Sequence, residues 1–132
     1  MEKNIKILAG GIIILLLAIA GYFAFFTSDE KIYNEDSTGV IVVKKGDTFK
    51  IILKSNPTTG YQWNESFDEN LIQLINKTYN ADEPQLMGSG GMETFEFKVI
   101  GHNSNTTINF AYSRVWESVP PIEEKSFQIK IK

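Results

Sequence analysis

The chain has 132 residues, which gives room for one folded domain rather than two. Its net charge is −3 and no basic stripe is present, so the composition does not indicate a nucleic-acid-binding protein. Cysteine is absent and histidine occurs once, which excludes disulfides and thiol-linked lipids and would leave a zinc site with mostly carboxylate ligands, an unusual set. We expect no metal and no cofactor.

Residues 1–26 predict a membrane anchor or signal segment. No charged residue occurs from Ile7 to Phe26, and a helix of about 20 residues is about 30 Å long, the thickness of a bilayer's hydrocarbon core. Lysines precede this segment and acidic residues follow it, so the positive-inside tendency keeps the N-terminus cytoplasmic. We therefore expect a single transmembrane helix that anchors an extracytoplasmic C-terminal domain in the membrane.

A cleaved signal peptide is the alternative for this segment. Ile7–Leu17 would then be its apolar core and Ala18-Ile19-Ala20 its cleavage site, and the domain would be secreted. Cleavage there would leave the apolar residues 21–26 exposed to water, so we favour the uncleaved anchor. Both interpretations place the domain outside the cytoplasm.

The domain itself is predicted at residues 39–132, after a polar, acidic linker at 27–38 that lacks periodicity. From Gly39 onward, apolar and polar residues alternate in short runs, which buries one face of each strand and exposes the other. The runs are Val40–Lys44, Asp47–Ser55, Tyr61–Ser66, Leu71–Tyr79, Met92–Ile100, Thr106–Arg114 and Lys125–Lys132. The predicted fold is all-β: an immunoglobulin-like antiparallel β-sandwich.

Two details of this strand pattern are open. The turn Lys45-Gly46 joins its flanking strands either as a hairpin or as a tight corner. The run Leu71–Tyr79 fits a helix as well as a strand, because its apolar residues have both spacings.

Catalytic chemistry is poorly represented. His102 lies in a polar turn, and the segment Met87–Gly91 lacks the first glycine of a nucleophile elbow. A hydrolase would depend on Ser89 and His102 alone, so we do not expect an enzyme. Three sequons, at Asn64, Asn76 and Asn105, could carry glycans in an exported domain, and the sequence leaves their use undecided.

Three turns have unusual chemistry: Asn56-Pro-Thr-Thr-Gly60, Met87-Gly-Ser-Gly-Gly91, and Arg114-Val-Trp116 leading into Pro120-Pro121. They follow the second, fourth and sixth predicted strands. In an immunoglobulin-like sandwich those turns meet at one end, where antibodies place their binding loops.

The motifs NPTTGYQW at 56–63, GSGG at 88–91 and RVWE at 114–117 followed by PPI resemble the chagasin-like inhibitors of cysteine proteases. The family pattern is N-P-T-T-G-[YF]-x-W, then G-x-G-G, then R-P-[WF], and both the order and the placement between strands agree. The resemblance covers residues 39–132. Val115 occupies the position where the family has proline, which suggests a less rigid third loop.

The resemblance implies a reversible, tight-binding inhibitor of papain-family cysteine proteases that occludes the active-site cleft with three loops. The loop matching Asn56–Gly60 would sit over the catalytic cysteine, braced on either side by the other two loops. We expect it to act as a monomer. The implied protease-binding residues are Asn56, Pro57, Thr58, Thr59, Gly60, Tyr61, Gly88, Ser89, Gly90, Gly91, Arg114, Val115 and Trp116.

The residue types suit that role. Pro57 fixes its own φ, and Gly60 lets the backbone pass close to a partner or take a positive φ. Arg114 and Trp116 are types that dominate binding hot spots. Each also has a structural explanation: NPTTG is a competent turn by itself, and Tyr61 and Trp63 suit the core. The alternative function is an immunoglobulin-like adhesion or scaffold module whose end loops bind another protein.

Overall fold

The computed structural model describes residues 31–84 and 86–132. The expected membrane segment lies outside the described residues and remains a prediction. The described residues contain no helix that could span a bilayer.

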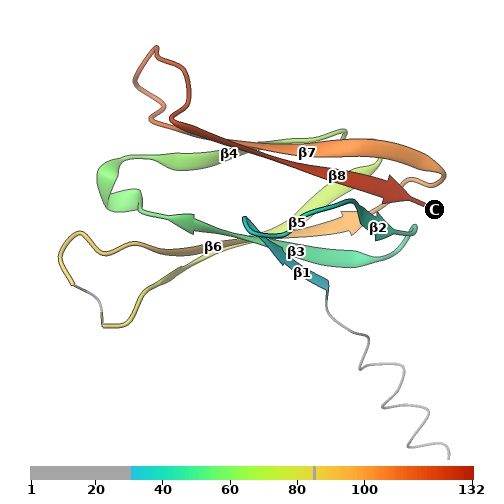
Figure 1. Ribbon diagram of the computed structural model, residues 1–132, viewed down its shortest axis with the longest axis horizontal. Coiled ribbons are helices and arrows are strands. Elements are labelled where there is room, and N and C mark those ends of the chain that lie inside the picture. Colours follow the sequence, from blue (N-terminus) through green and yellow to red (C-terminus); the bar gives the residue numbers. More distant parts are fainter. Residues whose placement is uncertain (1–30, 85) are drawn as a thin grey trace, which may run out of the picture.

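The described residues form a sandwich of two four-stranded sheets (Figure 1). The first sheet has the order β1 (Lys31–Asn34), β3 (Thr48–Ser55), β6 (Gly91–Val99), β5 (Ile72–Ala81). The second has the order β2 (Ile41–Val43), β8 (Glu123–Ile131), β7 (Ser104–Ser113), β4 (Gln62–Ser66). The predicted all-β sandwich is confirmed, and its connectivity is that of an immunoglobulin domain, with β2 as an additional edge strand.

The expectation of purely antiparallel sheets is wrong at two edges. β1 pairs parallel with β3, and β2 pairs parallel with β8, while the other four pairs are antiparallel. The reason is that the chain changes sheets between β1 and β2 and again between β2 and β3. The Lys45-Gly46 turn is therefore a tight corner and not a hairpin.

The linker expectation also changes, because residues 31–34 form β1 within the expected segment 27–38. Only one side chain of β1 packs inward: Tyr33 meets Phe49 edge-on, with ring centroids 6.4 Å apart. One half-buried residue in four leaves no periodicity to detect. The ambiguous run Leu71–Tyr79 is a strand, since β5 pairs along its length with β6.

The core lies between the sheets and is made of the inward-facing residues that the alternation predicts. Trp63 is 1% exposed, and its indole N–H donates to the carbonyl of Lys54 at 2.8 Å. Its ring stacks on Tyr112 with centroids 4.7 Å apart. The prediction that Trp63 belongs to the core is confirmed. Burying each such large side chain contributes about 1.5–3 kcal/mol to folding.

Candidate functional site

Three loops project from one end of the sandwich, the left end in Figure 1. They join β3 to β4 (residues 56–61), β5 to β6 (82–90) and β7 to β8 (114–122). We call this end the loop end. The prediction that the three motifs meet at one end is confirmed, because contacts between the loops connect all three. Ser89 is at the loop end, whereas His102 lies in the turn between β6 and β7 at the opposite end.

The first loop is a single 3₁₀ turn, Pro57–Thr59, that closes on itself. The carbonyl of Asn56 accepts from both the amide and the hydroxyl of Thr59, at 3.2 and 2.6 Å, and the amide of Gly60 donates to the carbonyl of Pro57 at 3.0 Å. Proline suits the first position of a helical turn, and Gly60 ends it with φ +82°, a left-handed conformation that favours glycine. Residues 57–59 are exposed, so the turn presents a pre-formed tip to solvent.

The other two loops hold this turn from either side. The side-chain amide of Asn56 donates to the carbonyl of Gly88 at 2.9 Å, and Nε of Arg114 donates to the carbonyl of Thr59 at 2.9 Å. Trp116 lies against Gly60 so closely that a Cβ there would be 2.1 Å from the indole Cη2. Each neighbouring loop is thus in direct contact with the first.

Arg114 is the centre of the third loop's contacts. Its guanidinium lies over the ring of Tyr61, 4.3 Å from the centroid, and 6.0 Å from the centroid of Trp116. Nη1 donates to a carboxylate oxygen of Glu117 at 2.9 Å, and this hydrogen bond raises the pKa of Arg114 above its ordinary value. The charged guanidinium is therefore available for cation–π contact with both rings.

An aromatic column connects the loop end to the core. The ring of Tyr61 packs on that of Tyr112 at 5.4 Å, and Tyr112 stacks on buried Trp63. The hydroxyl of Tyr112 also accepts a hydrogen bond from the amide of Asn56 at 2.9 Å. Tyr61 is half-buried between Arg114 and Tyr112, so it is partly core and partly site. The site prediction did not include Tyr112: its alternation placed it inward, but its spacing gave no sign of a contact with residue 56.

The glycine motif divides between the loop and the strand. Gly88 has φ +80° and lies at the tip, and the amide of Ser89 donates to the carbonyl of Leu86 at 3.0 Å. A Cβ on Gly90 would be 2.8 Å from the carbonyl oxygen of Ser55. Gly91, expected among the protease-binding residues, is buried in β6 and pairs with both neighbouring strands. Its smallness serves strand packing, since a Cβ there would be 2.2 Å from the carbonyl oxygen of Asn80.

The loop end also exposes large apolar side chains. Leu86 and Val115 are each 67% exposed, Trp116 is 66% exposed, and Met87 is fully exposed. Exposed apolar groups gathered at one end of a domain mark an interaction surface. Leu86 and Met87 were missed from the sequence, although an apolar pair directly before a glycine-rich turn was a signal that could have identified them.

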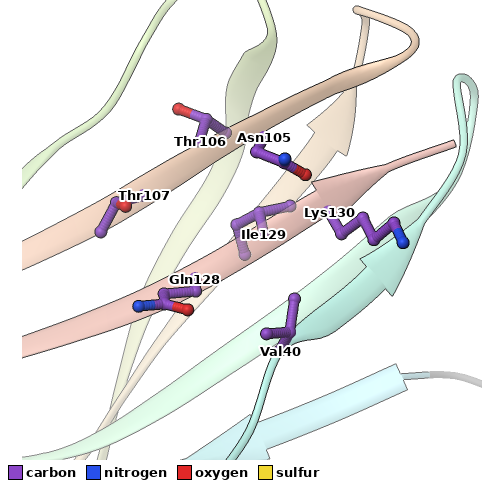
Figure 2. Close-up of a pocket in the computed structure, with 7 residues that line it drawn as sticks. All are labelled: Val40, Asn105, Thr106, Thr107, Gln128, Ile129 and Lys130. Atoms are coloured by element: carbon purple, nitrogen blue, oxygen red, sulfur yellow. The ribbon is translucent and has the colours of Figure 1, made fainter.

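The sequon asparagines are all on strands outside the three loops. Asn64 is on β4 and donates to the hydroxyl of Ser113 at 3.3 Å, and Asn76 is on β5. Figure 2 shows Asn105 on β7, beside a shallow hollow of about 400 Å³ on the outer face of β7 and β8. All three asparagines are exposed, and glycan attachment remains a prediction. Among residues 31–84 and 86–132, no cluster of histidine and carboxylate side chains is placed to hold a metal ion.

Fold and site together define a β-sandwich with three loops at one end, of which the first is held by the other two. A family model described as the chagasin family peptidase inhibitor I42 matches residues 42–131, and the chain belongs to this family. Its members are peptidase inhibitors and not enzymes, so the resemblance inferred from the three motifs is confirmed.

Individual relatives agree with this assignment. Chagasin from Trypanosoma cruzi is 30% identical over 108 residues, covering 77% of this chain and 96% of its own. Amoebiasin-1 from Entamoeba histolytica is 29% identical, covering 74% and 92%. The crystal structure of EhICP2, a cysteine protease inhibitor from Entamoeba histolytica, superposes with a TM-score of 0.68 at 26% identity, covering 77% of this chain and 94% of that one.

Proposed function

We propose that this chain is a reversible, tight-binding inhibitor of papain-family cysteine proteases, and that the loop end is its inhibitory surface. The exposed turn Pro57–Thr59 would enter the active-site cleft, and the loops at 82–90 and 114–122 would contact the cleft walls. The observation that carries this proposal is the bracing of an exposed turn by Asn56–Gly88 and Arg114–Thr59 hydrogen bonds within a family of peptidase inhibitors.

The geometry of the turn explains how it can occupy a protease without being cleaved. A protease binds its substrate in an extended conformation, whereas residues 57–59 are wound into a 3₁₀ turn with internal hydrogen bonds. Unwinding the turn would break its contacts with both neighbouring loops. Because the turn is already ordered before binding, little conformational entropy is lost on association. The result is a wedge that binds tightly and offers no well-placed peptide bond.

The apolar side chains at the loop end fit the same role. Leu86 and Met87 on one side, and Val115 and Trp116 on the other, would lose their exposure to water on contact with the protease. Tryptophan and arginine in such positions contribute a large share of binding energy in protein interfaces.

The expected location is the extracytoplasmic face of a membrane, with residues 7–26 as anchor. This part of the proposal depends on the length of the uncharged segment and the charges that flank it. Mass spectrometry of the mature N-terminus tests it, because a chain whose signal peptide had been cleaved would lack residues 1–20.

Titration of papain with the full-length chain in mild detergent tests the inhibitory function. We expect stoichiometric loss of protease activity, recovered on dilution or competition, with the inhibitor intact on a gel. Undiminished activity of papain and several cathepsin-like proteases at micromolar inhibitor would exclude the proposal and favour the adhesion module.

A further inference from the structure

The chain enters the sandwich at the end opposite the loops. β1 runs parallel to β3, and β3 leads directly into the inhibitory turn. Lys31, the first residue of β1, is level with Phe49 near the start of β3. The segment before residue 31 therefore joins the domain at the far end, together with the turn at 44–47 and the end of β8.

That far end carries a concentration of positive charge, although the chain as a whole is acidic. Its lysines are all exposed: Lys31, Lys44, Lys45, Lys98, Lys130 and Lys132. The carboxylates at the same end are Asp47, Asp68 and Glu69, and Asp47 is already within 3.9 Å of a lysine. We call this surface the basic end.

The loop end has the opposite balance. Its acidic residues are Asp82, Glu83, Glu117, Glu123 and Glu124, against Lys54, Arg114 and Lys125. Each of these cations has a carboxylate partner: Arg114 is paired with Glu117, Lys125 with Glu123, and Lys54 with Glu35 at 3.7 Å. The domain is thus polarised along its long axis, with the positive end nearest to where residues 27–30 attach.

The connection between the uncharged segment and the domain is short. Phe26 and Lys31 are separated by residues 27–30 only, which can span at most about 18 Å when fully extended. An anchored domain is therefore kept close to the bilayer surface, and its attachment point determines which end faces the lipid.

We propose that the basic end docks on anionic lipid headgroups, so that the loop end is directed away from the membrane. The inference depends on the proposed anchor at residues 7–26. Lysines beside a membrane are attracted to anionic headgroups, and acidic loops are repelled by the same surface. The two effects act on opposite ends of one rigid sandwich and favour the same orientation.

Single-cysteine labelling tests this orientation cleanly, because the chain contains no cysteine. The full-length chain is reconstituted into vesicles of phosphatidylcholine, alone or mixed with phosphatidylglycerol, with a fluorophore on His102→Cys at the basic end or Ser118→Cys at the loop end. Quenching by headgroup spin-labelled lipid reports proximity. We expect quenching at residue 102 to rise about twofold with phosphatidylglycerol and to fall again at high salt, and quenching at residue 118 to stay low.

Two matched double variants assign the effect to the basic end. The double variant Lys45→Glu with Lys132→Glu should abolish the rise in quenching at residue 102. The control, Lys54→Glu with Lys125→Glu, changes the net charge by the same amount and should leave that rise in quenching unaltered. Equal quenching at both labels, or no dependence on phosphatidylglycerol, overturns the docking inference. Release of the chain by alkaline carbonate overturns the anchored arrangement and the inference with it. Papain inhibition by the samples labelled at His102→Cys, away from the three loops, reports the proposed function independently.

Discussion

The two ends of the sandwich differ in how neighbouring turns are joined to one another. At the basic end, turns are closed by backbone hydrogen bonds such as Gly46 N–H to the carbonyl of Val99 at 2.8 Å and Gly101 N–H to that of Leu71 at 3.0 Å. At the loop end, side chains of Asn56 and Arg114 join one loop to another. Backbone closure tolerates many sequences, whereas side-chain bracing requires particular residues. This difference explains why the recognisable motifs gather at one end.

Replacing one glycine at each end should show the largest difference between the two ends. Gly60 and Gly46 both have positive φ, but only Gly60 is packed against Trp116. We expect Gly60→Glu to raise the inhibition constant for papain about 100-fold, or about 2.8 kcal/mol, because the side chain displaces the indole and reshapes the turn.

Gly46→Glu is the matched control, with open space around its Cβ. Both variants should lose about 1–2 kcal/mol of stability from the left-handed backbone, measured by thermal unfolding. Equal inhibition constants for the two variants would contradict the role given to the first loop.

Removing the arginine that joins the third loop to the first should have the next largest effect. Arg114→Ala loses the hydrogen bond to Thr59, the stacking on Tyr61 and the ion pair with Glu117. We expect about 30-fold weaker inhibition, mainly through faster dissociation. Lys125→Ala removes a cation at the same end without touching the loops and should change inhibition less than twofold. Similar effects of both variants would indicate a general charge effect.

Removing one hydroxyl tests whether the aromatic column positions the inhibitory turn. Tyr112→Phe keeps the stack on Trp63 but leaves the amide of Asn56 without its acceptor. We expect about fivefold weaker inhibition and about 1 kcal/mol lower stability. Tyr33→Phe, at the β1 edge, removes a hydroxyl far from the loops and should leave the inhibition constant unchanged. Unaltered binding by Tyr112→Phe would show that stacking alone holds the turn.

The smallest expected effect comes from restoring proline to the third loop. The amide of Glu117 donates to the carbonyl of Arg114 at 3.2 Å, so Val115 is the second residue of a β-turn, a position that proline favours. We expect Val115→Pro to tighten inhibition about threefold by reducing the freedom of the unbound loop. Weaker binding, measured as faster dissociation from papain, would indicate that the valine side chain itself contacts the protease.

Most strands could be predicted from sequence because one face of each is buried. Phe95, Phe97 and Val99 alternate with polar residues on β6, and each of the three is at most 1% exposed. β1 could not be found in this way, since Tyr33 alone packs inward. The parallel pairing of β1 with β3 and of β2 with β8 could not be predicted either. Alternation shows which face of a strand is buried, but it does not show which strand lies beside it.

The site was predictable as a set of loops but not as a set of contacts. Counting strands placed NPTTG, GSGG and RVW at one end, and the motifs indicated the family. Nothing in their spacing showed that Arg114 reaches the carbonyl of Thr59 or that Asn56 reaches that of Gly88, because both contacts join residues far apart in sequence. The position of Gly91 in β6 could not be predicted either, because a glycine required for close strand packing looks the same in sequence as a glycine in a binding loop.

The parallel alignment of β1 with β3 has a consequence for which proteases the chain can meet. With the anchor proposed at residues 7–26, the tether and the turn Pro57–Thr59 would lie at opposite ends, separated by strands such as β7, whose ten residues span about 33 Å. A protease captured by an anchored chain is then held with its active-site cleft turned toward the bilayer and its own bulk pointing away. The proposed anchored arrangement would suit a freely diffusing protease. A protease anchored in the same membrane would bind only if its active-site cleft faced that membrane.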